Sequence, residues 1–217
     1  MEIKFHKYHG TGNDFIIIDL FKNESEVKLF DESTVKTMCD RHFGIGADGL
    51  ILIVSSKSYD FKMVYFNSDG KTSSMCGNGG RCIVKYAHEK KYISDTCHFE
   101  AIDGVHRADI KDDLVYLHMR NIQKIVQGDN FYTMDTGSPH YVIFRSDIAS
   151  MDIKSEAHQI RYNKKYAEKG INVNFVERQE EDIYTRTYER GVEDETLSCG
   201  TGAVACAIAC HQKYDDL

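Results

Sequence analysis

The chain is poor in several features that would assign it to a particular class of protein. None of its apolar runs reaches the roughly 18 residues that a membrane-spanning helix needs, so we expect no membrane partner. The first seven residues lack the apolar core of a secretory signal. Basic residues number 27 against 34 acidic ones, and a formal net charge of −7 argues against a nucleic-acid partner, whose phosphates require a basic surface.

Cysteine is present, but without the pattern of a disulfide framework. The count of seven is odd and the spacing is loose, which favours reduced thiols and a cytoplasmic location. Cys76 and Cys82 are too far apart for a zinc knuckle, and no histidine pair accompanies Cys206 and Cys210. We therefore expect no metal site in an otherwise ordinary globular chain of 217 residues that is 41% hydrophobic and 28% charged.

One short motif occurs twice in the chain. Residues 75–82 read MCGNGGRC and residues 198–203 read SCGTGA, and each motif leads into an apolar, helix-like run. A Thr-Gly pair precedes each thiol at a similar distance, at Thr11 and Thr136. Repeated pieces in the same order predict two copies of one structural unit. We place them at residues 1–120, with Cys76, and 121–217, with Cys199, and expect both thiols to reach a shared cleft.

The hydrophobic pattern predicts mostly strands in each half, with a central helix after each thiol. We expect strands on both sides of a glycine loop at 9–14, and further strands at 50–54, 61–66, 97–101, 105–110, 114–119, 132–135, 141–144, 171–176 and 183–188. Additional helices are expected at 31–42, capped by Asp31 or Ser33, and at about 155–168, closed by Gly170.

Two further features of the second half carry structural predictions. Residues 203–210 are apolar on every side, which predicts a helix buried within a closed sheet. Pro139 is the only proline of the chain, and we expect it to stiffen the loop that leads to the strand at 141–144.

Each repeated thiol lies where a glycine-rich turn would lead into a helix N-terminus. Free backbone N–H groups and the helix dipole stabilise anions at such a place, so we expect the pKa of both thiols to fall toward neutrality. The N–H groups of Gly77, Asn78, Gly200 and Thr201 could also hold a substrate carboxylate.

Two such thiols suit the inversion of a carbon centre. One, as thiolate, would remove a proton, and the other, as thiol, would return a proton to the opposite face. The N–H groups of the helix ends would stabilise the charge that develops beside a carboxylate. No electron-sink cofactor is required, and no lysine motif indicates pyridoxal phosphate. The alternatives are two small buried cysteines, which the duplication disfavours, and a redox pair, which the wide separation in sequence disfavours.

These motifs, together with others in the same order, resemble the diaminopimelate epimerase family. The matching segments are GTGNDF (10–15), RHFGIGADG (41–49), FNSDG (66–70), MCGNGGRC (75–82), GSPH (137–140), INVNF (171–175), YERG (188–191) and ETLSCGTGA (195–203). The resemblance implies an α+β fold with two pseudo-symmetric halves, each a mainly antiparallel β-barrel around a central helix. It also implies cofactor-independent interconversion of LL- and meso-2,6-diaminoheptanedioate in lysine and peptidoglycan precursor synthesis, with a homodimer as a possible assembly.

By match of motif, the resemblance also assigns roles to individual residues. Cys76 and Cys199 would be the acid/base pair, and His140 and Glu189 would assist catalysis. Substrate would be bound by Asn13, Asn67, Gly77, Asn78, Asn172, Glu189, Arg190, Gly200 and Thr201. An arginine can bind a carboxylate as a fork, and a glutamate can bind an ammonium group, so a diamino dicarboxylic acid fits this set.

The chain departs from the family pattern at several places. Ser138 stands where many members carry asparagine, and Gly49 stands where some carry glutamine. Members usually continue for about fifty residues past the counterpart of Leu217, and a chain without those strands would expose sheet edges, so we expect low stability or a compensating partner. A two-cysteine racemase for proline, hydroxyproline or another amino acid, and a non-catalytic binding protein for a diamino acid, are the alternative functions.

Overall fold

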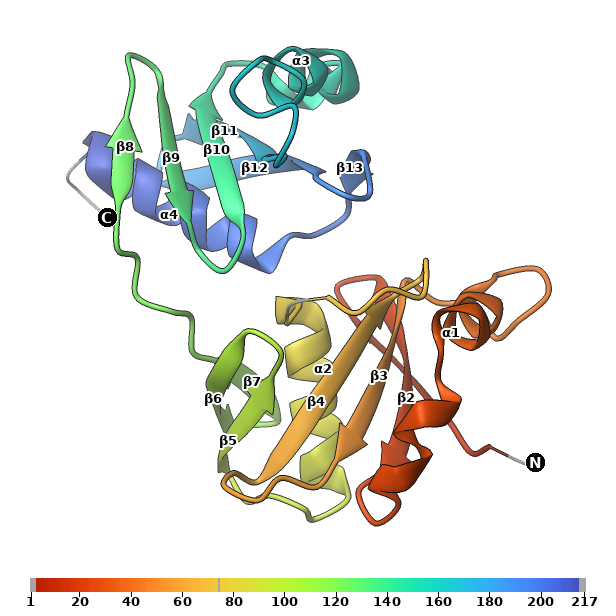
Figure 1. Cartoon of the computed structure of the whole chain (residues 1–217). Helices are drawn as coiled ribbons and strands as arrows, with labels where there is room; N and C mark the ends of the chain where they lie inside the picture. Colours follow the sequence, from red (N-terminus) through yellow and green to blue (C-terminus); the bar gives the residue numbers. More distant parts are fainter. Residues whose placement is uncertain (1–2, 74, 215–217) are drawn as a thin grey trace. The chain divides into compact units, whose positions relative to one another are not determined.

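The computed structural model describes residues 3–73 and 75–214. The chain divides into two compact units, Met1–His118 and Met119–Leu217 (Figure 1). Each unit contains one sheet and one long helix that follows a motif thiol, so the predicted α+β fold class is confirmed. No described helix is both long and apolar enough to cross a bilayer.

The first unit is a seven-stranded sheet whose spatial order follows the chain. Its strands are β1 (His6–Gly10), β2 (Asn13–Leu20), β3 (Gly49–Val54), β4 (Phe61–Asn67), β5 (Thr96–Ala101), β6 (Gly104–Lys111) and β7 (Leu114–Leu117). The β2–β3 and β4–β5 pairs are parallel, and the others are antiparallel. Both outer strands, β1 and β7, contact helix α2 (Gly77–Glu89), so the sheet curls around this helix.

The central strands of this sheet are buried on both faces. Phe15, Ile17 and Ile51 pack toward α2, whereas Ile16 and Leu50 pack toward helix α1 (Glu32–Cys39). Figure 1 shows the two helices on opposite sides of β2–β4, and a short 3₁₀ helix at Glu24–Leu29 precedes α1. A strand covered on both faces needs apolar side chains at successive positions, which accounts for the run from Phe15 to Ile18.

The second unit is a six-stranded sheet with the order β13-β12-β11-β10-β9-β8. Its strands are β8 (Ile125–Gln127), β9 (Phe131–Asp135), β10 (Pro139–Phe144), β11 (Asn172–Gln179), β12 (Asp182–Glu189) and β13 (Asp194–Thr196). Only the β10–β11 pair is parallel. Helix α3 (Ile153–Arg161) packs on one face of this sheet and helix α4 (Gly200–Tyr214) packs on the other (Figure 1). A short 3₁₀ helix at Ile148–Ser150 precedes α3.

The predicted duplication is confirmed by the topology. In both units a parallel strand pair is connected through a helix, a further antiparallel strand follows, and a long helix then begins after the motif thiol. The series β2–α1–β3–β4–α2 therefore corresponds to β10–α3–β11–β12–α4. Strands β5–β7 have no counterpart among the described residues of the second unit.

One prediction about α4 is wrong. The side chains of Ala203 and Ala207 are exposed, and those of Val204 and Ile208 are only partly buried, so the helix is not enclosed on every side. Within residues 119–214, the sheet covers α4 through β9–β12 on one side only. The buried side carries Ala205, Cys206, Ala209 and Cys210.

Smaller differences have local causes. Asp31 caps α1 as predicted, and its carboxylate accepts a hydrogen bond from Thr34 N at 2.8 Å. The helix ends at Cys39 instead of position 42 because the Asp40 carboxylate accepts the N–H groups of His42 and Phe43. Pro139 is the first residue of β10 rather than part of the loop, a place where a strand tolerates a missing N–H.

Candidate functional site

The first motif thiol lies directly before α2. Cys76 has extended backbone, and its carbonyl accepts the first helical hydrogen bond from Gly80 N at 2.7 Å. Gly77, Asn78 and Gly79 form a buried first turn. A Cβ on Gly79 would lie 3.1 Å from Ile51 Cδ1, so glycine lets the helix start pack directly on the sheet. The backbone N–H groups of this first turn, which have no acceptor within the helix itself, therefore lie beside the thiol.

Asn13 links the thiol to the helix start. Its Oδ1 accepts from the Cys76 thiol at 3.6 Å and from Asn78 Nδ2 at 3.2 Å. Its Nδ2 donates to Asp48 Oδ2 at 2.8 Å. The Arg81 guanidinium also donates to Asn78 Oδ1. We call Cys76, Asn13 and Asn78 the Cys76 cluster, and the structure thus brings together three of the residues that the sequence selected.

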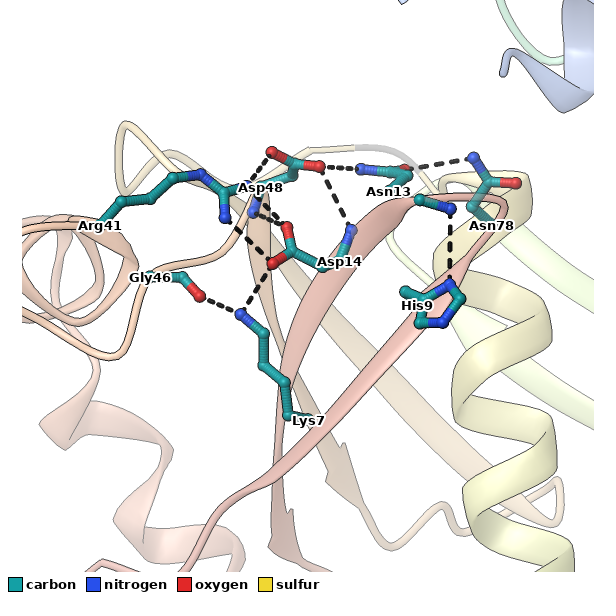
Figure 2. A network of polar contacts seen from close by, with 9 residues as sticks. Lys7, His9, Asn13, Asp14, Arg41, Gly46, Asp48 and Asn78 are labelled. Carbon is teal, nitrogen blue, oxygen red and sulfur yellow. Dashed lines mark hydrogen bonds and ion pairs between the residues drawn. The ribbon is translucent and has the colours of Figure 1, made fainter. Parts of the chain in front are cut away.

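Four charged side chains form a network beside Asn13 (Figure 2). Arg41 donates to both carboxylate oxygens of Asp14 at 2.7 and 3.1 Å, and to Asp48 Oδ1 at 2.7 Å. Lys7 pairs with Asp14 at 2.8 Å. Burial alone would raise the pKa of Asp14, but the hydrogen bonds from Arg41 and Lys7 outweigh burial and hold that pKa well below its usual range. We call Lys7, Asp14, Arg41 and Asp48 the charged quartet.

Asn67 lies at the end of β4, where it pairs with Gly49 of β3. Its backbone closes the turn that follows through bonds to Gly70 and Lys71, and its side chain is hydrogen-bonded to no other described residue. A Cβ on Gly49 would lie 2.7 Å from both Tyr65 Cε2 and the Phe66 carbonyl. The Tyr65 ring therefore occupies the space in which a side chain at position 49 would begin.

The second motif thiol lies at the start of α4. The Cys199 carbonyl accepts from Ala203 N at 2.8 Å, and Thr201 Oγ1 lies 3.5 Å from Cys199 Sγ. His140 Nε2 lies 2.9 Å from Thr201 Oγ1, and Asn174 Nδ2 lies 3.0 Å from His140 Nδ1. We call Cys199, Thr201, His140 and Asn174 the Cys199 cluster.

The hydrogen bonds assign the tautomer of His140. Asn174 Nδ2 donates to the Tyr141 carbonyl, which can only accept, at 3.1 Å, so the NH₂ group of Asn174 is the one that faces His140 Nδ1 at 3.0 Å. His140 must then carry its proton on Nε2 and donate it to Thr201 Oγ1. The Thr201 hydroxyl is left to donate toward Cys199 Sγ. A fully buried histidine therefore orients the Thr201 hydroxyl, which in turn donates a hydrogen bond toward the second thiol.

The expected fall in the thiol pKa is wrong for Cys199. Burial, together with the negative charge of Glu189, raises the pKa of this thiol to about 12 and outweighs the bonds from Thr201 and Gly202 N–H. The sequence showed the helix terminus but not the burial or the nearby carboxylate. The thiolate of Cys199 is therefore disfavoured while the site contains only the protein's own groups.

The remaining residues of the second unit form a chain of contacts beside this cluster. Asn172 Oδ1 accepts from Arg190 N at 2.8 Å, and Asn172 Nδ2 donates to Ser138 Oγ at 2.9 Å. The Arg190 guanidinium contacts Ser138 Oγ at 3.4 Å and the Lys169 carbonyl at 3.0 Å. Glu189 Oε1 accepts from Thr196 Oγ1 at 2.8 Å. Ser138 is thus hydrogen-bonded to both Asn172 and Arg190.

Sequence reasoning missed three supporting residues of these clusters. Asn174 is fully buried in β11, and an asparagine within an apolar strand signals a polar partner, because an unpaired buried amide is costly. Arg41 and Asp48 belong to the segment 41–49, whose sequence alone indicates no role for either side chain. Only the fold brings that segment to the glycine loop of β1–β2.

The burial of His140 predicts a measurable pH dependence of stability. Burial lowers its pKa from 6.5 to about 4. Between these values the unfolded chain binds a proton that the folded chain does not, so acidification from pH 6.5 to 4 should cost up to about 3 kcal/mol of unfolding free energy. Urea unfolding at pH 7 and 4.5 measures this loss, and His140→Gln should lose less than the parent chain. An equal loss in both proteins would show that His140 is protonated in the folded state.

Comparison with known proteins adds independent information. A sequence model described as "Diaminopimelate epimerase" matches residues 5–122 and 132–216. The chain is similar to a diaminopimelate epimerase from Flavobacterium psychrophilum, with 49% identity over 95% of this chain and 81% of the relative. It is also similar to a diaminopimelate epimerase from Aquifex aeolicus, with 38% identity over 97% of this chain and 82% of the relative.

Solved structures share the fold at much lower identity. A phenazine biosynthesis protein of the PhzF family from Bacillus anthracis aligns over 99% of this chain and 81% of its own, with a TM-score of 0.69 and 12% identity. A hydroxyproline epimerase from Agrobacterium vitis aligns over 97% of this chain and 77% of its own, with a TM-score of 0.63 and 14% identity.

Proposed function

Because the chain belongs to the diaminopimelate epimerase family, we propose that it interconverts LL- and meso-2,6-diaminoheptanedioate with two thiols, as part of lysine and peptidoglycan precursor synthesis. The observation that carries the proposal is the pair of equivalent helix starts, each with a cysteine directly before a glycine-containing first turn. Each unit contributes one thiol. In one direction Cys199 removes the α-proton and Cys76 returns a proton to the opposite face, and in the other direction the roles are exchanged.

The surroundings of the two thiols support different resting roles. The Cys76 thiol donates to an acceptor, Asn13 Oδ1, which suits a group that carries a proton. Cys199 faces two donors, the Thr201 hydroxyl and Gly202 N–H, which stabilise a thiolate once it forms, and the Glu189 carboxylate, which accepts from the thiol and opposes its ionisation. The helix N–H groups beside each thiol would stabilise the carboxylate next to the carbanion. This electrostatic support takes the place of an electron-sink cofactor.

The polar residues of the two units suit a substrate with a charged group at each end. The Arg190 guanidinium can bind a carboxylate as a fork, and Glu189 can accept from an ammonium group. Asn172 fixes the Arg190 backbone, while Ser138 contacts its guanidinium. Asn13 and Asn67 lie at the ends of β2 and β4, where their amides can both donate and accept.

The test is an assay with defined stereoisomers. We expect the protein to convert LL-2,6-diaminoheptanedioate to the meso form without added cofactor, and to leave L-proline and trans-4-hydroxy-L-proline unchanged. Racemisation of either proline substrate in preference to the diamino acid would favour a related amino-acid racemase. Tight binding of the diamino acid without inversion would indicate a binding protein.

Two properties of the whole molecule complete the proposal. All seven cysteines are free, which supports function in the reducing cytoplasm. A homodimer remains the possible assembly that the family resemblance implies. Sedimentation velocity would detect the dimer.

A further inference from the structure

The amide of Asn13 can adopt only one orientation. Its Oδ1 lies beside two donors, the Cys76 thiol and Asn78 Nδ2, and its Nδ2 lies beside the Asp48 carboxylate. A rotation of the amide by half a turn would oppose two NH₂ groups at Asn78 and two oxygens at Asp48. Both ends would then lose their hydrogen bonds. The carboxylate of Asp48, together with Asn78 Nδ2, therefore determines which atom of Asn13 faces the thiol.

Asp48 is itself held from several directions (Figure 2). Its Oδ1 accepts from Arg41 at 2.7 Å, and its Oδ2 accepts from Asp14 N at 3.2 Å. The Asp48 N–H donates in return to Asp14 Oδ1 at 3.0 Å. The loop that carries Arg41 is fixed as well, since Ile45 N and Gly46 N both donate to the Met38 carbonyl. Asp48 can therefore act as a rigid support although it is partly exposed.

The charged quartet also balances its own charge. Lys7 and Arg41 contribute two positive charges, and Asp14 and Asp48 contribute two negative ones. The carboxylate can thus orient Asn13 without placing a net negative charge near the thiol. An aspartate without the two cations would orient the amide equally well, but its negative charge would also destabilise a thiolate at Cys76.

We propose that Asp48, clamped by Arg41, is a positioning residue that turns the Asn13 amide oxygen toward Cys76 and thereby keeps this thiol protonated in the substrate-free enzyme. The proposal rests on the acid/base role of Cys76 proposed above. Asp48 touches neither substrate nor sulfur and acts only through Asn13. The quartet then favours Cys76 as a proton donor at the start of the catalytic cycle.

Other titratable groups lie on the elements packed around Cys76. They are Arg81 and Cys82 on α2, Tyr65 on β4, His9 on β1, and Asp103 in the turn before β6, which accepts from Met75 N at 3.2 Å and from His106 at 3.2 Å. None of these residues is altered in the variants below, so a change in the behaviour of Cys76 can be assigned to the quartet.

The experiment measures alkylation of Cys76 by iodoacetamide across pH 6–10 in the intact protein, read by peptide mass spectrometry. In Asp48→Asn the new amide can donate to Asn13 Oδ1, and this bond offsets the one lost to Asn78 when the Asn13 amide turns its NH₂ group toward the sulfur. A donor favours the thiolate, so alkylation of Cys76 at pH 7 should become about ten-fold faster and its pH profile should move to lower pH. Cys199 in the same samples is the internal control, and its profile should not change.

Asp40→Asn is the matched variant. Asp40 precedes Arg41 and holds the same loop through His42 N and Phe43 N, but makes no contact with Asn13. It should leave the Cys76 profile unchanged, which separates loop loosening from amide orientation. If Asp48→Asn does not fold, as judged by circular dichroism, Arg41→Gln should produce a smaller shift in the same direction.

An unchanged Cys76 profile in a folded Asp48→Asn or Arg41→Gln protein would overturn the inference, and so would an equal shift in Asp40→Asn. Alkylation requires no turnover. A parent protein that fails to invert its substrate would therefore contradict the proposed function, and the alkylation profiles would still decide the role of Asp48.

Discussion

Replacement of Cys76 or Cys199 by alanine should reduce epimerisation of 2,6-diaminoheptanedioate by about a thousand-fold, within the range expected for loss of one positioned acid or base. Each thiol directly precedes the first turn of its helix, and no second cysteine of the described structure lies in an equivalent place. Coupled assays of inversion measure the loss. Calorimetric titration with the diamino acid should show that binding survives, because the helix N–H groups and Arg190 are retained.

The single variants should also differ from each other in proton exchange. Each keeps one thiol, which can still remove and return a proton on its own face of the carbon. In heavy water we therefore expect each variant to exchange the α-proton of one stereoisomer without inverting it, and the two variants to act on opposite stereoisomers.

Cys82→Ala and Cys206→Ala are the matched controls. Both residues are buried, Cys82 on α2 and Cys206 on α4, among apolar side chains. Each should retain activity within a few-fold of the parent protein. Normal turnover by Cys76→Ala or Cys199→Ala would show that the two-thiol mechanism is wrong.

Gly202→Ala should lower kcat by about a hundred-fold, the scale on which a misplacement of about 1 Å acts on a catalytic group. A Cβ at this position would lie 2.5 Å from Asn174 Oδ1 and 3.2 Å from Cys199 Sγ. Asn174 is fully buried and hydrogen-bonded to Thr187 and His140, so it cannot move away without breaking that network. The new methyl group should therefore displace the thiol and the histidine together.

Gly79→Ala tests the equivalent position in the first unit. A Cβ there would meet Ile51 Cδ1 at 3.1 Å, with Met63 Cε and Phe15 Cε1 at 3.4 Å. These atoms are the ends of apolar side chains, and two of them can adjust by small rotations. Steady-state kinetics should show a loss of less than about ten-fold for Gly79→Ala. A larger loss than for Gly202→Ala would contradict the account of the Cys199 cluster.

Much of the fold could be predicted because its signals are local. The alternating strands, the Asp31 cap and the two glycine-rich helix starts each depend on residues that are close in sequence. The repeated thiols also predicted the duplicated topology, because the order of the motifs follows the order of the elements. The short strands β8 and β13 escaped prediction, since three residues carry too little pattern.

The parts that could not be predicted depend on tertiary contacts between residues that are far apart in sequence. Ala203 and Ala207 are apolar, but whether α4 is enclosed depends on the strands available around it. The helix dipole at Cys199 is visible in the sequence, whereas the burial and the Glu189 charge that outweigh it are not. Asp48 reaches Asn13 across 35 positions of chain, and Arg41 reaches Asp14 across 27, so their role emerges only from the folded sheet.

The central claim is that two thiols serve opposite faces of one carbon. The most direct measurement follows LL-2,6-diaminoheptanedioate by NMR in heavy water during the first few per cent of turnover. We predict that the meso product carries deuterium at the inverted α-carbon while the recovered LL substrate keeps its protium. Deuterium that enters substrate and product at the same rate, or protium carried over into the product, would contradict the account.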